Sequence, residues 1–89
     1  MQVRASHILV ETLNEAKTLH QKIVNGESFG DLAAKHSKCP SGRKGGDLGN
    51  FGPGMMVKPF EDAAFGLEVG SMSEPVQTQF GWHLVQRTG

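Results

Sequence analysis

Two histidines and a lone cysteine are the residues of this 89-residue chain whose types could carry acid–base, nucleophilic or metal-binding chemistry. His7 and His83 lie among apolar neighbours in segments with the composition of β-strands, whereas His20 and His36 occupy polar positions of predicted helices. A histidine inside a strand is most often a hydrogen-bonded structural residue. Two of them in so short a chain, together with Cys39, slightly favour a functional cluster.

The first chemistry to consider is nucleophilic attack by Cys39 after a histidine has removed its proton, as in thiol hydrolases. Pro40 argues against it, because a proline there disfavours helical geometry at Cys39, lacks a backbone N–H and leaves no evident oxyanion donor. A metal site made of Cys39, His7 and His83 is a second hypothesis, but the chain lacks closely paired ligands of the C-x-x-C or H-x-x-x-H kind. No metal and no other cofactor is expected. A phosphate-binding loop is not indicated, since no G-x-G-x-x-G motif occurs.

Charge is balanced over the whole chain but not along it. Nine cations and nine anions give a formal net charge of zero, which argues against general binding to nucleic acids or membranes. Four of the cations, Lys35, Lys38, Arg43 and Lys44, nevertheless fall within ten residues that contain no acid. This basic stretch is either a solvated surface or a weak preference for acidic ligands.

Large apolar side chains are concentrated in segments that also carry loop signals, because the glycines 42, 45, 46, 49, 52 and 54 surround or precede them. Methionine and phenylalanine next to such backbone can line an adaptable pocket, although most of them are expected to belong to the core. The residues concerned are Leu48, Phe51, Met55, Met56, Val57, Phe60 and Phe80.

The elements that must position these residues can be predicted from periodicity and capping signals. Residues 2–10 predict a central strand, because neither of its faces is polar throughout. Thr12 and Glu15 form a capping box for a helix of about 13 residues that ends at Asn25-Gly26. Ser28 caps a second, shorter helix, which must end before Pro40.

The second half of the chain predicts one more helix and three short strands. A strand is expected at 48–51, a helix from Lys58-Pro59 to Val69-Gly70, an edge strand opening at 74–76, and a last strand at 82–87 after a turn at Phe80-Gly81. The resulting order indicates an α+β fold in which helices cover a small antiparallel sheet.

Length and composition predict a single domain spanning residues 1–89. No apolar run approaches the roughly 20 residues of a membrane span, and no signal-peptide core follows the first residues. One cysteine excludes an internal disulfide and favours a reducing compartment. We therefore expect a cytoplasmic protein, or a domain excised from a longer one.

Four motifs in order resemble the parvulin family of peptidyl-prolyl cis-trans isomerases, and together they span nearly the whole chain. They are Ser6-His7-Ile8-Leu9-Val10, the loop from Cys39 to Gly49, Met56-Val57-Lys58-Pro59-Phe60, and Phe80-Gly81-Trp82-His83.

This resemblance implies a βα3βαβ2 fold, with a four-stranded antiparallel sheet surrounded by helices. It also implies a monomeric, cofactor-free enzyme that acts on X-Pro bonds of proline-containing peptides and of unfolded or flexible protein segments, as a folding helper. The family positions match His7, Cys39 and His83 as catalytic residues. They match Leu48, Met56 and Phe60 as the proline pocket, with Thr78 and Phe80 on its rim.

The chain departs from the phosphate-dependent branch of the family, which has a basic loop directly after the first strand. Here Val10 is followed by Glu11 and the helix cap, so no phosphoserine-proline preference is expected. No amino-terminal binding module is present in the chain as given, so targeting by a companion domain is not expected. Two other hypotheses are a module that binds proline peptides without turnover and a nucleic-acid binder that uses residues 35–44.

Overall fold

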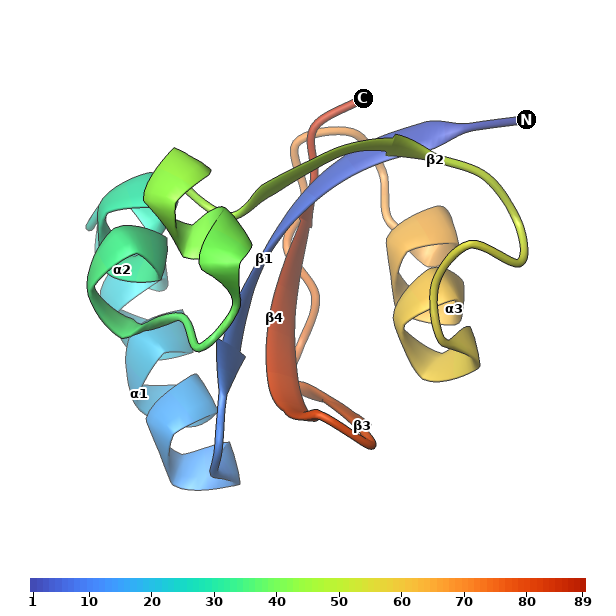
Figure 1. Ribbon diagram of the computed structural model, residues 1–89. Helices are drawn as coiled ribbons and strands as arrows, with labels where there is room; N and C mark the ends of the chain where they lie inside the picture. Colours follow the sequence, from blue (N-terminus) through green and yellow to red (C-terminus); the bar gives the residue numbers. More distant parts are fainter.

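The strand β1 (Val3–Val10) lies inside a four-stranded antiparallel sheet whose order is β2-β1-β4-β3. Its neighbours are β2 (Asp47–Phe51) and β4 (Gly81–Arg87), and β3 (Val76–Thr78) lies at the edge beyond β4. The computed structural model, drawn in Figure 1, describes all residues from 1 to 89. The predicted central position of the first strand and the predicted edge position of the strand near Val76 are confirmed.

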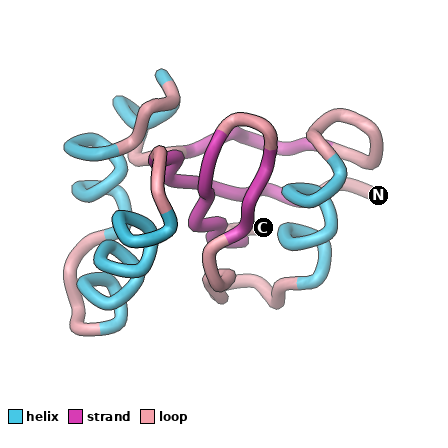
Figure 2. The backbone as a smooth tube through the Cα atoms, turned by 90° about the horizontal axis from the view of Figure 1, so that it is seen from below, coloured by secondary structure: helices cyan, strands magenta, loops and turns pink.

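The helices are divided between the two faces of the sheet. Helices α1 (Leu13–Val24) and α2 (Phe29–His36) lie on one side and α3 (Lys58–Gly66) on the other, as Figures 1 and 2 show. A 3-10 helix, η1 (Pro40–Lys44), packs beside α2. This arrangement is the βα3βαβ2 order that the resemblance implies, with a 3-10 helix as the third of the first three. No helix combines the length and the hydrophobicity that crossing a membrane requires.

Alternation along β1 and β4 produces two cores. One contains Ile8 and Val10 of β1 together with buried residues of α1 and α2, and the other contains Ala5 and Val85 together with Phe60 of α3. Because successive strand residues point to opposite faces, His7 and His83 share the face of Ala5 and Val85, which is the face covered by α3.

The predicted helix starts are confirmed. The Thr12 hydroxyl accepts a hydrogen bond from the Glu15 backbone N–H at 3.2 Å, and the Ser28 hydroxyl accepts one from the Asp31 N–H at 3.2 Å. Helix α3 begins at Lys58 with Pro59 in its first turn, where a missing N–H leaves no bond unmade.

Two expectations for the elements after α2 were wrong. Helix α3 ends at Gly66 and not at Val69-Gly70, because Leu67 turns to extended geometry and its carbonyl accepts a hydrogen bond from Arg87 at 2.8 Å. The glycine segment is also not a plain loop before the strand, since Pro40–Lys44 forms η1, which ends at Gly45 in the left-handed conformation.

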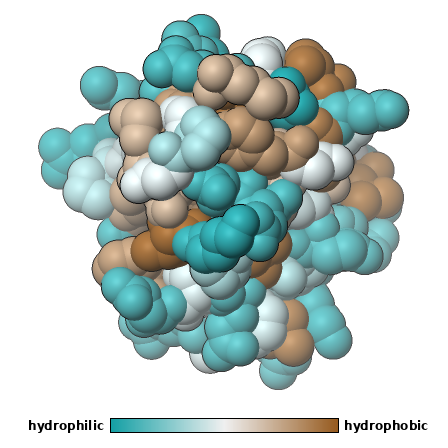
Figure 3. All heavy atoms as spheres, turned by 90° about the vertical axis from the view of Figure 1, so that its right-hand side faces the viewer, coloured by the Kyte–Doolittle hydropathy of each residue, from teal (hydrophilic) through white to brown (hydrophobic).

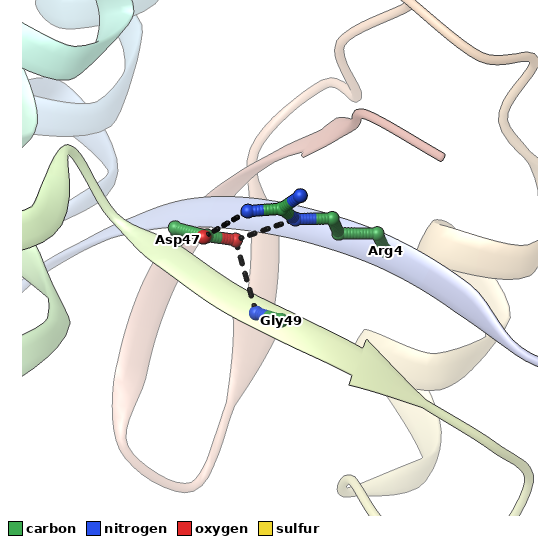
Figure 4. A network of polar contacts seen from close by, with 3 residues as sticks. All are labelled: Arg4, Asp47 and Gly49. Atoms are coloured by element: carbon green, nitrogen blue, oxygen red, sulfur yellow. Dashed lines mark hydrogen bonds and ion pairs between the residues drawn. The ribbon is translucent and has the colours of Figure 1, made fainter.

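A charged pair joins β1 to β2 next to a register shift. Arg4 Nε and Nη2 donate to Asp47 Oδ1 and Oδ2, at 3.2 and 2.6 Å, and the Gly49 N–H donates to the same carboxylate at 3.0 Å (Figure 4). The hydrogen bond from Arg4, together with the Gly49 N–H, lowers the pKa of Asp47 to about 2. These contacts hold the start of β2, and therefore Leu48, next to β1.

The two ends of the chain lie beside each other. The Arg4 N–H donates to the Gly89 carbonyl at 3.2 Å, and the Arg4 carbonyl accepts from the N–H groups of Thr88 and Gly89 at 2.8 and 3.0 Å. In Figure 1 both termini are found at the same end of the sheet, opposite the turn between β3 and β4.

Gly46 approaches β1 so closely that no side chain fits there. The His7 N–H donates to the Gly46 carbonyl at 2.9 Å, and a Cβ on Gly46 would lie 2.3 Å from the His7 carbonyl oxygen. Its φ of +86° also favours glycine. Only glycine at this position lets β2 start next to His7.

We expect Gly46→Ala to lower the free energy of unfolding by about 3 kcal/mol or more, because backbone strain is added to a backbone clash. Gly54→Ala is the matched control, since Gly54 has a φ of +84° but nothing within 4 Å of its Cβ position. The control should cost only about 1 kcal/mol. Equal losses for both variants in urea unfolding would contradict this account of Gly46.

Candidate active site

The floor of the candidate site is a pair of buried imidazoles in contact across two strands. His83 pairs with Leu9 in the sheet register, which places it diagonally opposite His7 on the α3 face. The two Nδ1 atoms lie 2.9 Å apart, and the side chains are 5% and 4% exposed. Phe60 meets both rings at steep angles, with centroid distances of 5.4 Å to His7 and 5.3 Å to His83.

Burial keeps both imidazoles uncharged at neutral pH. Loss of solvation, with a smaller contribution from the neighbouring His83, lowers the pKa of His7 to about 4. Burial likewise lowers the pKa of His83. The floor of the site is therefore polar but neutral, and it adds no ionic field to the space above it.

The hydrogen bonds around His83 define one proton arrangement. The Phe80 N–H donates to the Thr78 hydroxyl at 3.1 Å, and the same hydroxyl lies 2.7 Å from His83 Nε2. If Thr78 donates to Nε2, then His83 Nδ1–H donates to His7, and only the buried His7 Nε2 has no partner. In the opposite arrangement His7 Nδ1–H donates to His83, and His83 Nε2–H donates to Thr78. The Thr78 hydroxyl proton would then also lack an acceptor in the protein. We therefore infer that the Thr78 hydroxyl donates to His83 Nε2 and that His83 Nδ1–H donates to His7 Nδ1.

Cys39 forms part of a wall that is tied to the edge of β1. The Lys38 N–H donates to the Leu9 carbonyl at 2.7 Å, and the Ser37 hydroxyl accepts from the N–H groups of Leu9 and Cys39 at 3.1 and 3.3 Å. The thiol is half-buried, and its one hydrogen bond comes from the Ser41 hydroxyl at 3.3 Å. Because no histidine is within hydrogen-bond reach of the sulfur, the geometry provides no base for a thiolate nucleophile.

These side chains surround one hollow with a volume of about 500 Å³, which we call the proline hollow. The size and the mainly apolar lining are typical of small-ligand sites. The predicted residues that line it are His7, Cys39, Leu48, Met56, Phe60, Phe80 and His83. The structure thus brings together seven of the eight residues matched by resemblance, although their individual roles stay predictions.

Thr78 is the eighth, and it is not a lining residue. It contacts the site through His83 and holds the Phe80 N–H, so we assign it a positioning role in place of the expected rim contact. Phe80 does lie at the rim, where it is 62% exposed.

Five further residues line the hollow: Leu9, Lys38, Pro40, Met55 and Val57. Met55 and Val57 were among the apolar side chains considered for an adaptable pocket, whereas Leu9, Lys38 and Pro40 were not assigned to the site from the sequence. Leu9 could have been found, because it lies two residues after His7 and therefore on the same strand face. Lys38 and Pro40 flank Cys39 directly. Met55 is 63% exposed. On the side of the molecule that carries α3, hydrophobic side chains reach the surface between hydrophilic ones (Figure 3). No three His, Cys, Asp or Glu side chains are grouped so that they could hold a metal ion.

Comparison with known proteins agrees with this geometry. Residues 6–89 match the model of the Rotamase family, described as the PPIC-type PPIASE domain. The chain belongs to this family. The resemblance to parvulins is thereby confirmed, and so is the α+β fold that it implied.

Relatives fall into two size classes. Foldase protein PrsA 4 of Bacillus cereus is 51% identical over 87 residues, which are 97% of this chain but 31% of that protein. A crystal structure of peptidylprolyl isomerase (PrsA) from Bacillus anthracis has a TM-score of 0.97 at 46% identity, covering 99% of this chain and 41% of the other. NmPin, the parvuline of Nitrosopumilus maritimus, has a TM-score of 0.89 at 49% identity, covering 99% and 96%. The chain thus spans about a third of the PrsA relative's length and nearly all of the parvuline.

Protonation of the imidazole pair should destabilise the fold in a defined pH window. Between pH 6.5 and about 4 the unfolded chain binds a proton at His7 that the folded chain does not. The contribution of the neutral His7 to the free energy of unfolding is therefore fully present above pH 6.5 and is lost as the pH falls towards 4. We expect a loss of about 3 kcal/mol from His7, with a further contribution from His83. Urea unfolding as a function of pH measures it.

Asp47 provides the control for that window, because its contribution to stability is lost only as the pH falls from its ordinary pKa of 3.8 towards its folded pKa of about 2. Asp47→Asn should leave the loss between pH 6.5 and 4 intact. Imidazole NMR signals assign the effect: a His7 ring that titrates near pH 6.5 in the folded protein would contradict the proposed neutrality.

Proposed function

We propose that this chain accelerates rotation about X-Pro peptide bonds in polypeptides, binding the proline ring in the proline hollow. The carrying observation is a mainly apolar hollow built on an uncharged imidazole pair, in a chain that belongs to the PPIC-type isomerase family. A role as a folding helper is supported by the PrsA relatives, which are called foldase proteins.

The chemistry needs no bond to be made or broken. An X-Pro bond rotates slowly, over tens of seconds or longer, because twisting it breaks amide resonance and meets a barrier of about 20 kcal/mol. The planar amide carries more charge separation than the twisted one. A dry, apolar surrounding therefore disfavours the planar ground state relative to the twisted transition state, and each 1.4 kcal/mol of difference is a factor of ten in rate.

The lining suggests a division of roles. Leu48, Met56 and Phe60 hold the pyrrolidine ring from β2, from the following loop and from α3. The carbonyl that precedes the proline then swings on the side of Cys39, whose thiol acts as a polarisable wall. His7 and His83 keep the floor in one hydrogen-bonded arrangement without presenting a charge.

The expected substrates are proline-containing peptides and flexible protein segments, with no requirement for phosphate. Support comes from the connection between β1 and α1, which consists of Glu11 and Thr12 alone and carries no basic residue. The monomeric state and the cytoplasmic location stay predictions.

NMR exchange spectroscopy on a short Ala-Pro peptide tests the activity. We expect micromolar protein to accelerate cis-trans exchange, and Met56→Ala to lower kcat/KM by about tenfold or more, because one wall of the ring pocket is lost. Val69→Ala, which shortens an exposed apolar side chain outside the hollow, should have no effect. Peptide binding without any acceleration would support a pure binding module and contradict the proposal.

The Cys39→Asp variant tests whether the Cys39 thiol acts as a polar wall of the hollow or as a nucleophile. We expect this variant to keep substantial isomerase activity, because a carboxylate can serve as the polar wall but not as an attacking thiolate. Cys39→Ala is the companion variant that removes the polar atom while leaving room for the substrate. Complete loss of activity in Cys39→Asp, together with a thioester trapped on the unmodified protein and seen by mass spectrometry, would favour the nucleophile.

A further inference from the structure

Two members of the basic stretch identified in the sequence, Lys38 and Arg43, lie at or beside the proline hollow. A second hollow of about 420 Å³, here called the basic hollow, is lined by Ala34, Ser37, Lys38, Cys39, Pro40, Gly42 and Arg43. It shares Lys38, Cys39 and Pro40 with the proline hollow, so these three residues form a ridge between the two.

The charged side chains that line the two hollows are all basic. Lys38 lines both hollows and Arg43 lines the basic hollow, whereas no acidic side chain lines either of them. Arg43 and Lys35 make no ion pair. Lys38 is partly compensated by Glu11, whose carboxylate lies 3.5 Å from its ammonium in an exposed contact. A positive potential is therefore available at the ridge although the chain as a whole is neutral.

The direction of a bound peptide follows from the proposed function, on which this inference rests. With the ring between Leu48, Met56 and Phe60 and its preceding carbonyl near Cys39, the chain before the proline must leave across the ridge. The residue before a proline is restricted to extended or polyproline geometry, so it does not turn back into the hollow. In this pose we place its side chain on the ridge, next to Lys38.

We propose that Lys38, supported by Arg43, selects substrates with a carboxylate side chain on the residue immediately before the proline. Lys38 supplies an ammonium on a flexible stem, which can reach a Glu or Asp from the ridge. The contact is exposed to solvent, since the Lys38 side chain is 55% exposed, so its effect on rate is modest and depends on salt.

The test compares isosteric peptides, Ala-Ala-Glu-Pro-Ala and Ala-Ala-Gln-Pro-Ala, by NMR exchange, each normalised to its own uncatalysed rate. At low ionic strength we expect kcat/KM to be about threefold to fivefold higher for Glu than for Gln. The ratio should fall towards one near 1 M salt, where the Debye length is about 3 Å. Acceleration of both peptides to the same extent would overturn this inference and leave the isomerase proposal standing, whereas acceleration of neither would overturn the isomerase proposal itself.

Variants locate the effect. Lys38→Gln should abolish the preference for Glu, and Glu11→Gln should increase it, because the competing carboxylate is removed from Lys38. Glu68→Gln changes the net charge by the same amount on an exposed residue that lines neither hollow, and it should leave the ratio unchanged. A ratio that responds equally to Glu11→Gln and Glu68→Gln would contradict a contact at Lys38.

The position of the acid provides the last control. Ala-Ala-Pro-Glu-Ala and Ala-Ala-Pro-Gln-Ala place the same difference after the proline, on the side away from the ridge. We expect these two peptides to react at similar rates. An equal gain for Glu on both sides of the proline would indicate general attraction and overturn the assignment to the residue before it.

Discussion

The contact between two uncharged imidazoles across β1 and β4 is the constraint to which the rest of the site conforms. Strand alternation puts His7 and His83 on a face that otherwise carries apolar residues, and Phe60 closes over both rings. Three of the four buried ring nitrogens are hydrogen-bonded, to the other ring or to Thr78, which offsets much of the cost of burying the uncharged rings. A neutral floor in turn permits an apolar hollow above it, which is the environment that X-Pro rotation needs.

Local sequence signals predicted most of the elements and only part of the site. Capping residues such as Thr12 and Ser28 act within one turn, so the helix starts could be read directly. The end of α3 could not, because Arg87 reaches Leu67 from twenty residues away. The 3-10 helix was missed for a related reason: abundant glycine predicts unusual backbone but not which hydrogen bonds that backbone forms.

The same distinction applies to the lining residues. His7, Cys39 and Met56 stand in motifs whose resemblance to the parvulins places them together, and the structure does so. Lys38 enters the site through a backbone hydrogen bond to Leu9, a contact between residues far apart in sequence that no local pattern encodes. The second, basic hollow and its ridge were therefore out of reach from the sequence, although the run of cations that borders them was not.

The pairing of Arg4 with Thr88 and Gly89 has an architectural consequence. A polypeptide enters and leaves this unit at the same end of the sheet, the end remote from the turn between β3 and β4, where Arg4 is hydrogen-bonded to Thr88 and Gly89. A larger protein can therefore carry such a unit as an insertion at small entropic cost.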